Sequence, residues 1–239
     1  MNRYYLQARL APTILTAIPL ISVYLFIVSP YVSNYLKVIL PMLPLIGDIS
    51  FSAAFVFILV QLNRTLSKEL LQSRFFKGET KMPTTDFLLY NNEEYSTETK
   101  DRIRRKIKDH FNMELFDSVA ETANEGKSRV MIKDCVGQIR VLLTENKMLL
   151  NHNIEYGALR NFLGGCIQAI LFSLVLIGHS AFAPFNKGIF IFSCFLLTIY
   201  TVPLFVSKWL MQRYGNNYAR ILYQQFLSVP TPISTQTTN

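Results

Sequence analysis

The chain has 239 residues, of which half are hydrophobic and only 17% are charged, and its formal net charge is +8. This balance argues against a soluble chain and is typical of a membrane protein. The charge is not a nucleic-acid signature in itself, because the segment 79–155 holds 12 basic and 14 acidic residues and the basic excess lies outside it. Three cysteines without pairing or metal-ligand spacing argue against a disulfide framework and a zinc site, and predict three buried free thiols.

Two apolar segments near the N-terminus predict a transmembrane hairpin. The first span is expected at 10–28, close to the ~20 residues that a spanning helix needs, with a kink at Pro19. The second apolar stretch is interrupted by two prolines, by Gly47 and by Asp48. We therefore expect an interfacial or re-entrant piece before Asp48 and a second span at 49–62.

The segment that follows has no apolar run long enough to span a membrane, and we expect it to fold as helices. One helix should begin near Ser96 or Thr97. Ile103, Ile107 and Phe111 repeat every four residues and give this helix one apolar face.

A second helix of this segment carries a regular 4-3 spacing, which is typical of a coiled coil. Two interpretations stay open. The residues pack against the apolar face of the preceding helix within one subunit, or they mediate self-association, in which Asn146 and Asn153 would set the register. This heptad seam consists of Ile132, Val136, Ile139, Leu143, Asn146, Leu150 and Asn153.

The C-terminal half predicts a second hairpin, with spans at 161–182 and 188–210. Pro203 should bend the last helix, and Trp209 is suited to the membrane interface. The predicted organisation is a hairpin over 1–76, a helical insert over 77–159, a hairpin over 160–225 and a disordered tail over 226–239.

The distribution of basic residues predicts the orientation. With four spans, both termini and the insert share one side, which holds 22 of the 24 Lys and Arg residues; only Lys37 and Lys187 lie opposite. The positive-inside rule makes that side the cytoplasm. The predicted fold is an all-α membrane protein with four transmembrane helices and a helical cytosolic insert between spans 2 and 3.

No motif in the chain supports catalysis. The three histidines have no ligand spacing, and no nucleophile elbow, P-loop or zinc-protease motif is present. His152 and Glu155 lie one turn apart, but a solvated cluster at the membrane interface is favoured over a metal site or a proton relay. We expect neither an enzyme nor a cofactor.

Two groups of basic residues in the insert predict a site for a polyanion, because guanidinium and ammonium groups bind phosphates without demanding a base sequence. Solvated faces with intramolecular ion pairs, or contact with anionic lipid, are the alternatives. The candidate ligand-binding residues are Arg102, Arg104, Arg105, Lys108, Arg129, Lys133, Arg140 and Lys147.

The junction between the insert and the third span predicts a gate. It is dense in polar residues and contains glycines that permit helices to rearrange. Uncharged polar residues inside the spans, such as Gln168 and Tyr200, would line a pore or bond between helices. The candidate coupling residues are Asn146, Asn153, Glu155, Gly157, Arg160, Gly164 and Gly165.

The junction sequence Asn151-His-Asn-Ile-Glu-Tyr-Gly-Ala-Leu-Arg-Asn-Phe-Leu-Gly-Gly, with the run from Thr84 to Phe111 and the layout of spans, resembles the channel-forming effector of the Hailong anti-phage system. The resemblance implies a multimeric channel of the bacterial inner membrane. Such a channel stays closed until a partner nucleotidyltransferase makes a single-stranded oligodeoxyadenylate. Opening then depolarises the infected cell and aborts phage growth.

Two functions are therefore expected from different classes. The first is a homo-oligomeric channel, with a tetramer weakly favoured, that contacts membrane lipid and opens on a nucleotide or single-stranded DNA oligomer. The nucleotidyltransferase itself is a further possible partner. The alternative is a non-conducting membrane adaptor or anchor whose insert binds a partner protein.

Overall fold

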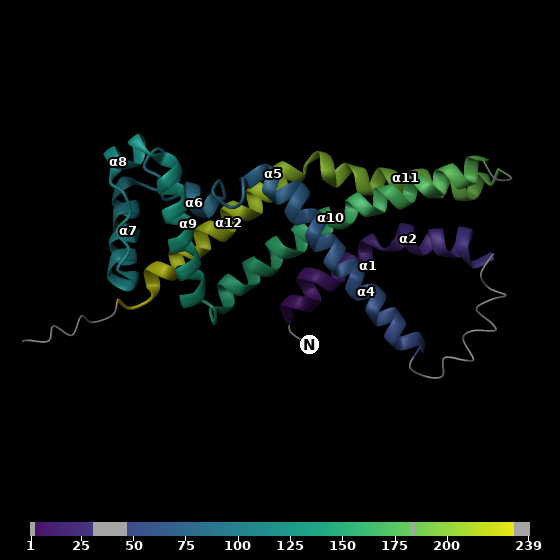
Figure 1. Cartoon of the computed structure of the whole chain (residues 1–239), viewed down its shortest axis with the longest axis horizontal. Helices are drawn as coiled ribbons and strands as arrows, with labels where there is room; N and C mark the ends of the chain where they lie inside the picture. The colour runs from purple at the N-terminus through teal and green to yellow at the C-terminus, as the bar shows by residue number, and fades with distance from the viewer. Residues whose placement is uncertain (1–2, 31–46, 183–184, 232–239) are drawn as a thin grey trace, which may run out of the picture. The chain divides into compact units, whose positions relative to one another are not determined.

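A computed structural model of the chain describes residues 3–30, 47–182 and 185–231, and every element within these ranges is a helix (Figure 1). The predicted all-α fold is therefore confirmed for this part. The expected re-entrant piece, up to residue 46, and the end of the expected tail, 232–239, lie outside the described residues. The chain divides into two compact units, Met1–Leu71 with Gly157–Met211 (the first unit) and Gln72–Tyr156 with Gln212–Asn239 (the second unit).

The first unit begins with an apolar helix over Arg3–Val28. It is built from η1 (Tyr5–Leu10), α1 (Ala11–Thr16), α2 (Ile18–Val23) and η2 (Tyr24–Val28), where η marks π-helical stretches. The α-helix is interrupted at Ala17, two residues before Pro19, where the kink is expected. The unit also contains α4 (Gly47–Leu66), the start of η4 (Ser67–Gln72), most of α10 (Lys147–Phe182), α11 (Lys187–Phe205) and the start of α12 (Ser207–Ser228).

Three helices in the described part are long and apolar enough to cross a membrane: Arg3–Val28, α10 and α11. Large apolar side chains on these helices face outward, among them Ile14, Leu171 and Phe195, whereas polar side chains such as Thr13 are buried between helices. This arrangement fits a multi-pass membrane protein, because lipid replaces water around the apolar surface. The expected span at 49–62 falls within α4, and the four-span arrangement stays a prediction.

The second unit is a small helical bundle with its own apolar core. Its core residues come mainly from α7, α9 and α12, with Ile107, Ile139 and Phe226 fully buried. In Figure 1, α7 and α9 lie beside the yellow end of α12. The elements of this unit are α5 (Ser73–Phe76), α6 (Pro83–Asp86), α7 (Thr97–Phe111), α8 (Ser118–Ala123), α9 (Glu125–Leu142), the first turns of α10 and most of α12.

The C-terminal segment departs from the prediction in two ways. The apolar helix expected to reach residue 210 is interrupted at Val206, three residues after Pro203. The tail expected to begin at residue 226 is ordered there instead. The α12 helix continues to Ser228, because Phe226 is buried and the Lys106 ammonium donates hydrogen bonds to the carbonyl oxygens of Leu227 (2.8 Å) and Val229.

The cysteines follow the expectation in part. Cys135 and Cys166 are buried free thiols, whereas Cys194 is partly exposed. Burial raises the pKa of the Cys135 thiol to about 11. That thiol therefore stays protonated and unreactive at neutral pH.

Candidate functional site

The α7 helix places basic residues of the predicted ligand set on its outer face. Ser96 caps the helix, since its hydroxyl oxygen accepts a hydrogen bond from the Thr99 amide at 3.3 Å, as expected for a serine N-cap. The apolar face turns inward, with Ile103 and Ile107 fully buried. The opposite face is therefore left for charged side chains.

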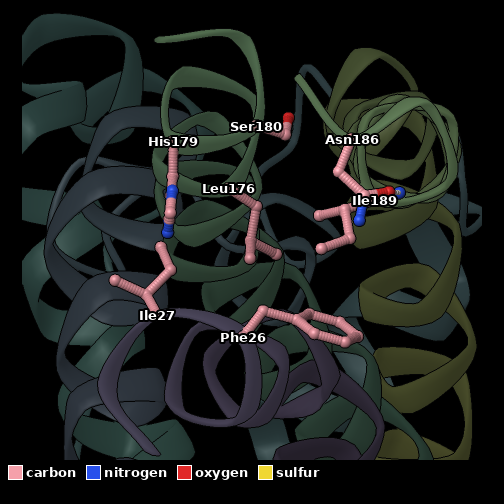
Figure 2. Close-up of a pocket in the computed structure, with 7 residues that line it drawn as sticks. All are labelled: Phe26, Ile27, Leu176, His179, Ser180, Asn186 and Ile189. Carbon is pink, nitrogen blue, oxygen red and sulfur yellow. Dashed lines mark hydrogen bonds between the residues drawn. The ribbon is translucent and has the colours of Figure 1, made fainter. Parts of the chain in front are cut away.

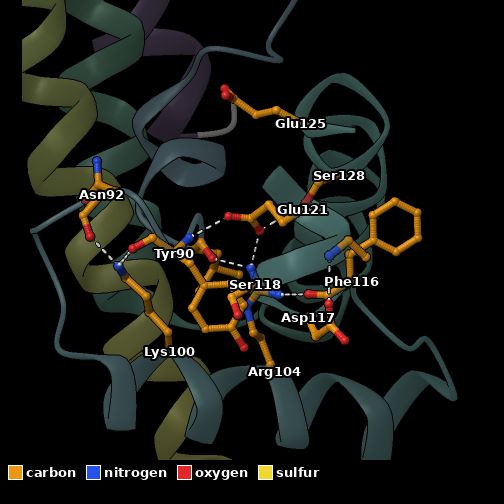
Figure 3. A network of polar contacts seen from close by, with 12 residues as sticks. Tyr90, Asn92, Lys100, Arg104, Phe116, Asp117, Ser118, Glu121, Glu125 and Ser128 are labelled. Atoms are coloured by element: carbon orange, nitrogen blue, oxygen red, sulfur yellow. Dashed lines mark hydrogen bonds and ion pairs between the residues drawn. The ribbon is translucent and has the colours of Figure 1, made fainter. Parts of the chain in front are cut away.

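Arg104 belongs to the interior of the second unit and not to its surface (Figure 3). Its guanidinium forms an ion pair with Glu121 at 2.6 Å, and the side chains of both are less than a tenth exposed. It also donates to the carbonyl oxygens of Leu88 and Phe116 and lies over the Tyr90 ring at 4.1 Å. The expectation that Arg104 binds a ligand is therefore wrong, because the side chain is buried and both terminal nitrogens of its guanidinium already have partners within the chain.

The second group of basic residues in the predicted ligand set, Arg129, Lys133, Arg140 and Lys147, is also partly paired within the chain. Arg129 bonds to Glu125 at 2.7 Å and to Asp86, and its side chain is 17% exposed. Arg140 lies 3.6 Å from Glu79. Arg129 and Arg140 therefore form ion pairs within the chain, which is the alternative to binding a ligand.

The remaining basic residues of the set are more open. None of the ion pairs in the described part of the chain involves Arg102 or Arg105, and both are exposed. Lys108 pairs with Glu114 at 2.8 Å, but both side chains are more than half exposed. Surface pairs of this kind contribute about 0–1 kcal/mol, so Lys108 remains available to a ligand. Lys133 is half-exposed and Lys147 is exposed.

The heptad seam packs within the subunit. Ile132, Val136 and Ile139 are buried in the same core as the apolar face of α7. The seam is not one helix, because α9 ends at Leu142 and α10 begins at Lys147.

One asparagine of the seam, Asn146, is hydrogen-bonded within the subunit. Asn146 caps α10, since its side-chain oxygen accepts a hydrogen bond from the Leu149 amide at 2.9 Å, and its amide nitrogen donates to Gln225 at 2.7 Å. The Asn146 side chain therefore forms its hydrogen bonds without a second subunit. Asn153 is half-buried. His152 and Glu155 lie 3.3 Å apart as a local pair, and the described residues contain no group of three metal-ligating side chains.

The predicted coupling glycines lie where helices of the first unit approach closely. A Cβ on Gly164 would lie 2.2 Å from the carbonyl oxygen of Asn63, and one on Gly165 would lie 2.2 Å from the Thr16 hydroxyl. A Cβ on Gly157 would meet the Tyr4 hydroxyl at 2.9 Å. The glycines thus hold α10 against the N-terminal helix and α4, and the nearby Arg160 is half-buried.

Asn63 lies at the centre of a buried polar cluster beside these glycines. Its amide nitrogen donates to the hydroxyls of Thr13 at 3.1 Å and Thr16 at 3.3 Å, and its oxygen accepts a bond from Gln168 at 2.6 Å. All four side chains are buried. Because lipid offers no hydrogen bonds, such contacts fix how helices pair. We call Thr13, Thr16, Asn63 and Gln168 the polar cluster.

Two prolines of the N-terminal helix extend this polar packing. A proline has no N–H, so it frees the carbonyl four residues earlier in an α-helix. The carbonyl oxygen of Ala8, four residues before Pro12, accepts a hydrogen bond from Asn161 of α10 at 2.6 Å. The carbonyl oxygen of Leu15, four residues before Pro19, accepts one from the Tyr200 hydroxyl of α11 at 2.6 Å. Each proline thereby creates an acceptor that a different helix satisfies.

Replacing Tyr200 with phenylalanine should lower the free energy of unfolding by about 1 kcal/mol, because hydrogen bonds inside membrane proteins contribute about 0.6 and at most about 1.7 kcal/mol. Unfolding of the full chain in mixed micelles measures this change. Tyr24→Phe is the control, since Tyr24 is 45% exposed on the same N-terminal helix. An equal effect from both variants would contradict the role of the Leu15 contact.

A pocket of about 170 Å³ lies at the other end of the N-terminal helix (Figure 2). Leu176 and Ile189 with Phe26 and Ile27 form its apolar part, and the polar residues His179, Ser180 and Asn186 lie at separate places along its wall. Two of these polar groups already bond within the chain, Ser180 to the Ile177 carbonyl and Asn186 to the Ile189 amide. The pocket would suit a small amphipathic group.

The fold and the buried polar packing together define the class of an all-helical membrane protein. Comparison with protein-family models, with characterised proteins and with solved structures finds no match for this chain. Function therefore has to be argued from the residues themselves.

Sequence reasoning named some of the polar residues that bond between helices of the first unit and missed others. Gln168 and Tyr200 stood out as polar residues inside predicted spans. Thr13, Thr16 and Asn161 did not, because each lies near a predicted helix end or bonds backward along its own helix.

Proposed function

We propose that this chain forms a homo-oligomeric ion channel of the bacterial inner membrane, with a tetramer favoured and both termini in the cytoplasm. A nucleotide or single-stranded oligodeoxyadenylate, made by a partner nucleotidyltransferase, binds the second unit and opens the channel. The resulting depolarisation would serve anti-phage defence. In this proposal the chain crosses the membrane four times, and the second unit is the cytosolic insert.

The observation that carries the proposal is the length of α10. This helix has 36 residues without a break, so it is about 54 Å long at 1.5 Å per residue. The hydrocarbon core of a bilayer is about 30 Å thick. The helix therefore extends well beyond the bilayer, and its residues belong to both units, with the boundary between Tyr156 and Gly157.

The part of α10 from Gly164 to Gln168 would act as the gate, because its contacts with other helices are polar and tight. Gly164, Gly165 and Gln168 lie within two turns of one another and contact two other helices of the first unit. A shift of α10 would break these contacts together. Packed helices of this kind change between discrete arrangements and do not deform gradually.

The proposed ligand surface is the outer face of α7. Arg102, Arg105 and Lys108 follow one another at intervals of three residues, so their side chains are neighbours along the helix. They would neutralise successive phosphates of a polyanion. Ligand binding opens the channel only if the ligand binds the open arrangement more tightly than the closed one.

Ion flux from liposomes containing the full chain tests both ligand binding and channel opening. We expect flux on adding oligodeoxyadenylate. Reversing two charges, Arg102→Glu with Arg105→Glu, should raise the required concentration at least tenfold, because each hydrogen bond to a charged group contributes about 1.5–3 kcal/mol and 1.4 kcal/mol is a factor of ten. Lys77→Glu with Lys81→Glu is the matched control, since both lysines are exposed in the same unit.

The alternative is a non-conducting membrane anchor whose second unit binds a partner protein. The internal pairing of Arg104 and Arg129 favours it, because it removes two arginines from the surface offered to a polyanion. Absence of flux with every oligonucleotide tested would support the anchor. A normal response of the Arg102/Arg105 variant would instead keep the channel and remove α7 from the ligand site.

A further inference from the structure

The outer face of α9 differs from the outer faces of the other long helices in the second unit. Val130, Gly137 and Val141 lie on one line along α9, opposite the buried heptad seam, and the two valines are 43% and 71% exposed. By contrast, the outer faces of α7 and of the second unit's part of α12 are polar. Their exposed residues are Thr97, Glu98, Arg102, Arg105, Lys108 and Asp109 on α7, and Gln212, Arg213, Asn217, Arg220, Gln224 and Ser228 on α12.

Gly137 has no explanation within the subunit. A Cβ built on it would meet nothing within 4 Å. Glycine in the middle of a helix is about 1 kcal/mol less favourable than alanine. The advantage of glycine is that it lets another backbone approach closely. Exposed valines spaced around such a glycine match the repeat of a helix–helix contact.

The charges beside this line determine which way a second copy of the helix would run. Viewed down α9 at 100° per residue, Lys133 and Arg140 lie on one side of the line, and Asp134 and the exposed Lys127 lie on the other. Within one chain, Asp134 lies 3.8 Å from the Lys133 ammonium. Two parallel copies bring opposite sides together, so that Asp134 of one copy meets Lys133 of the other. Two antiparallel copies bring like sides together and place the basic residues against each other, which is unfavourable.

We infer that the line Val130–Gly137–Val141 of α9 is a contact surface between subunits, occupied by the same surface of a second copy in parallel orientation. A two-fold rotation about an axis that runs along α9 brings the two surfaces together in this orientation. The inference rests on the homo-oligomer in the proposed function and names one of its contacts, since a surface that meets itself joins two copies. The heptad seam on the opposite face is buried, so it does not compete for this role.

Cysteine cross-linking of the full chain in detergent tests the surface and its orientation. In a Cys194→Ser background, Val130→Cys should form a disulfide-linked dimer on mild oxidation, because parallel copies bring the two residues together. In antiparallel copies centred on Gly137, they would be about 21 Å apart. The buried, protonated thiol of Cys135 will not compete. Val119→Cys on α8 is the control, since Val119 is 77% exposed away from this surface.

A second variant separates the contact from the fold. Gly137→Leu has room within the subunit and should leave helicity unchanged, but it should lower the cross-linking yield of Val130→Cys several-fold. An oligomer by light scattering with no Val130→Cys dimer would overturn the inference and leave the channel proposal standing. Cross-linking between Lys133→Cys and Val141→Cys chains, without the Val130→Cys dimer, would overturn the parallel orientation. A monomer would overturn both proposals.

Discussion

Replacing Glu121 with alanine is expected to lower the free energy of unfolding of the second unit by about 3–5 kcal/mol, the usual effect of removing one partner of a buried ion pair. The Arg104 guanidinium would be left charged in a site where its side chain is 7% exposed. The Tyr90 amide would also lose the carboxylate to which it donates at 2.6 Å. Hydrogen exchange of α7 and α8 in the full chain measures the loss.

Glu114→Ala is the matched control for this experiment. The same change removes the partner of Lys108, but Glu114 is 76% exposed, so the expected loss is below about 1 kcal/mol. Similar exchange rates for the two variants would show that the contacts of Arg104 do not hold the unit together.

Replacing Gly164 with alanine is expected to destabilise the first unit by about 3 kcal/mol, at the upper end of the range for overpacking. The added methyl group would lie 2.2 Å from a backbone oxygen of Asn63 and 2.8 Å from the Ser67 Cβ. Backbone atoms cannot swing aside as a flexible side chain does. The helices must therefore separate, and the bond between Gln168 and Asn63 would be strained with them.

Gly178→Ala makes the same chemical change on the same helix where nothing lies within 4 Å of the new atom. This variant should be as stable as the parent chain or slightly more stable, because alanine favours helix. Thermal unfolding of both variants in detergent measures the difference in stability. Equal midpoints would mean that α10 does not pack closely at Gly164.

The sequence was sufficient to predict elements whose signal is local. The start of α7 follows from Ser96 as a cap, and its inner face follows from the spacing of Ile103 and Ile107. The all-α class and the apolar helices follow from composition and length. The interruption near Pro19 follows from the chemistry of proline.

The sequence was not sufficient where the partner lies far along the chain. Arg104 and Arg105 are adjacent and look equivalent, yet one is buried and the other exposed, because Glu121 lies 17 residues beyond Arg104 and α8 brings it back. The heptad seam allowed packing within or between subunits, and its spacing is the same in both. Phe226 looked like part of a polar tail because nothing local indicates the α7 surface that covers it.

The freed carbonyls of the N-terminal helix have a consequence for biogenesis. Ala8 and Leu15 receive their side-chain donors from Asn161 and Tyr200, which lie 153 and 185 residues further along the chain. During synthesis the first helix therefore reaches the membrane long before either donor exists. An unsatisfied carbonyl costs several kcal/mol in hydrocarbon. The first helix must then stay in contact with water, or with the insertion machinery, until α10 and α11 are made.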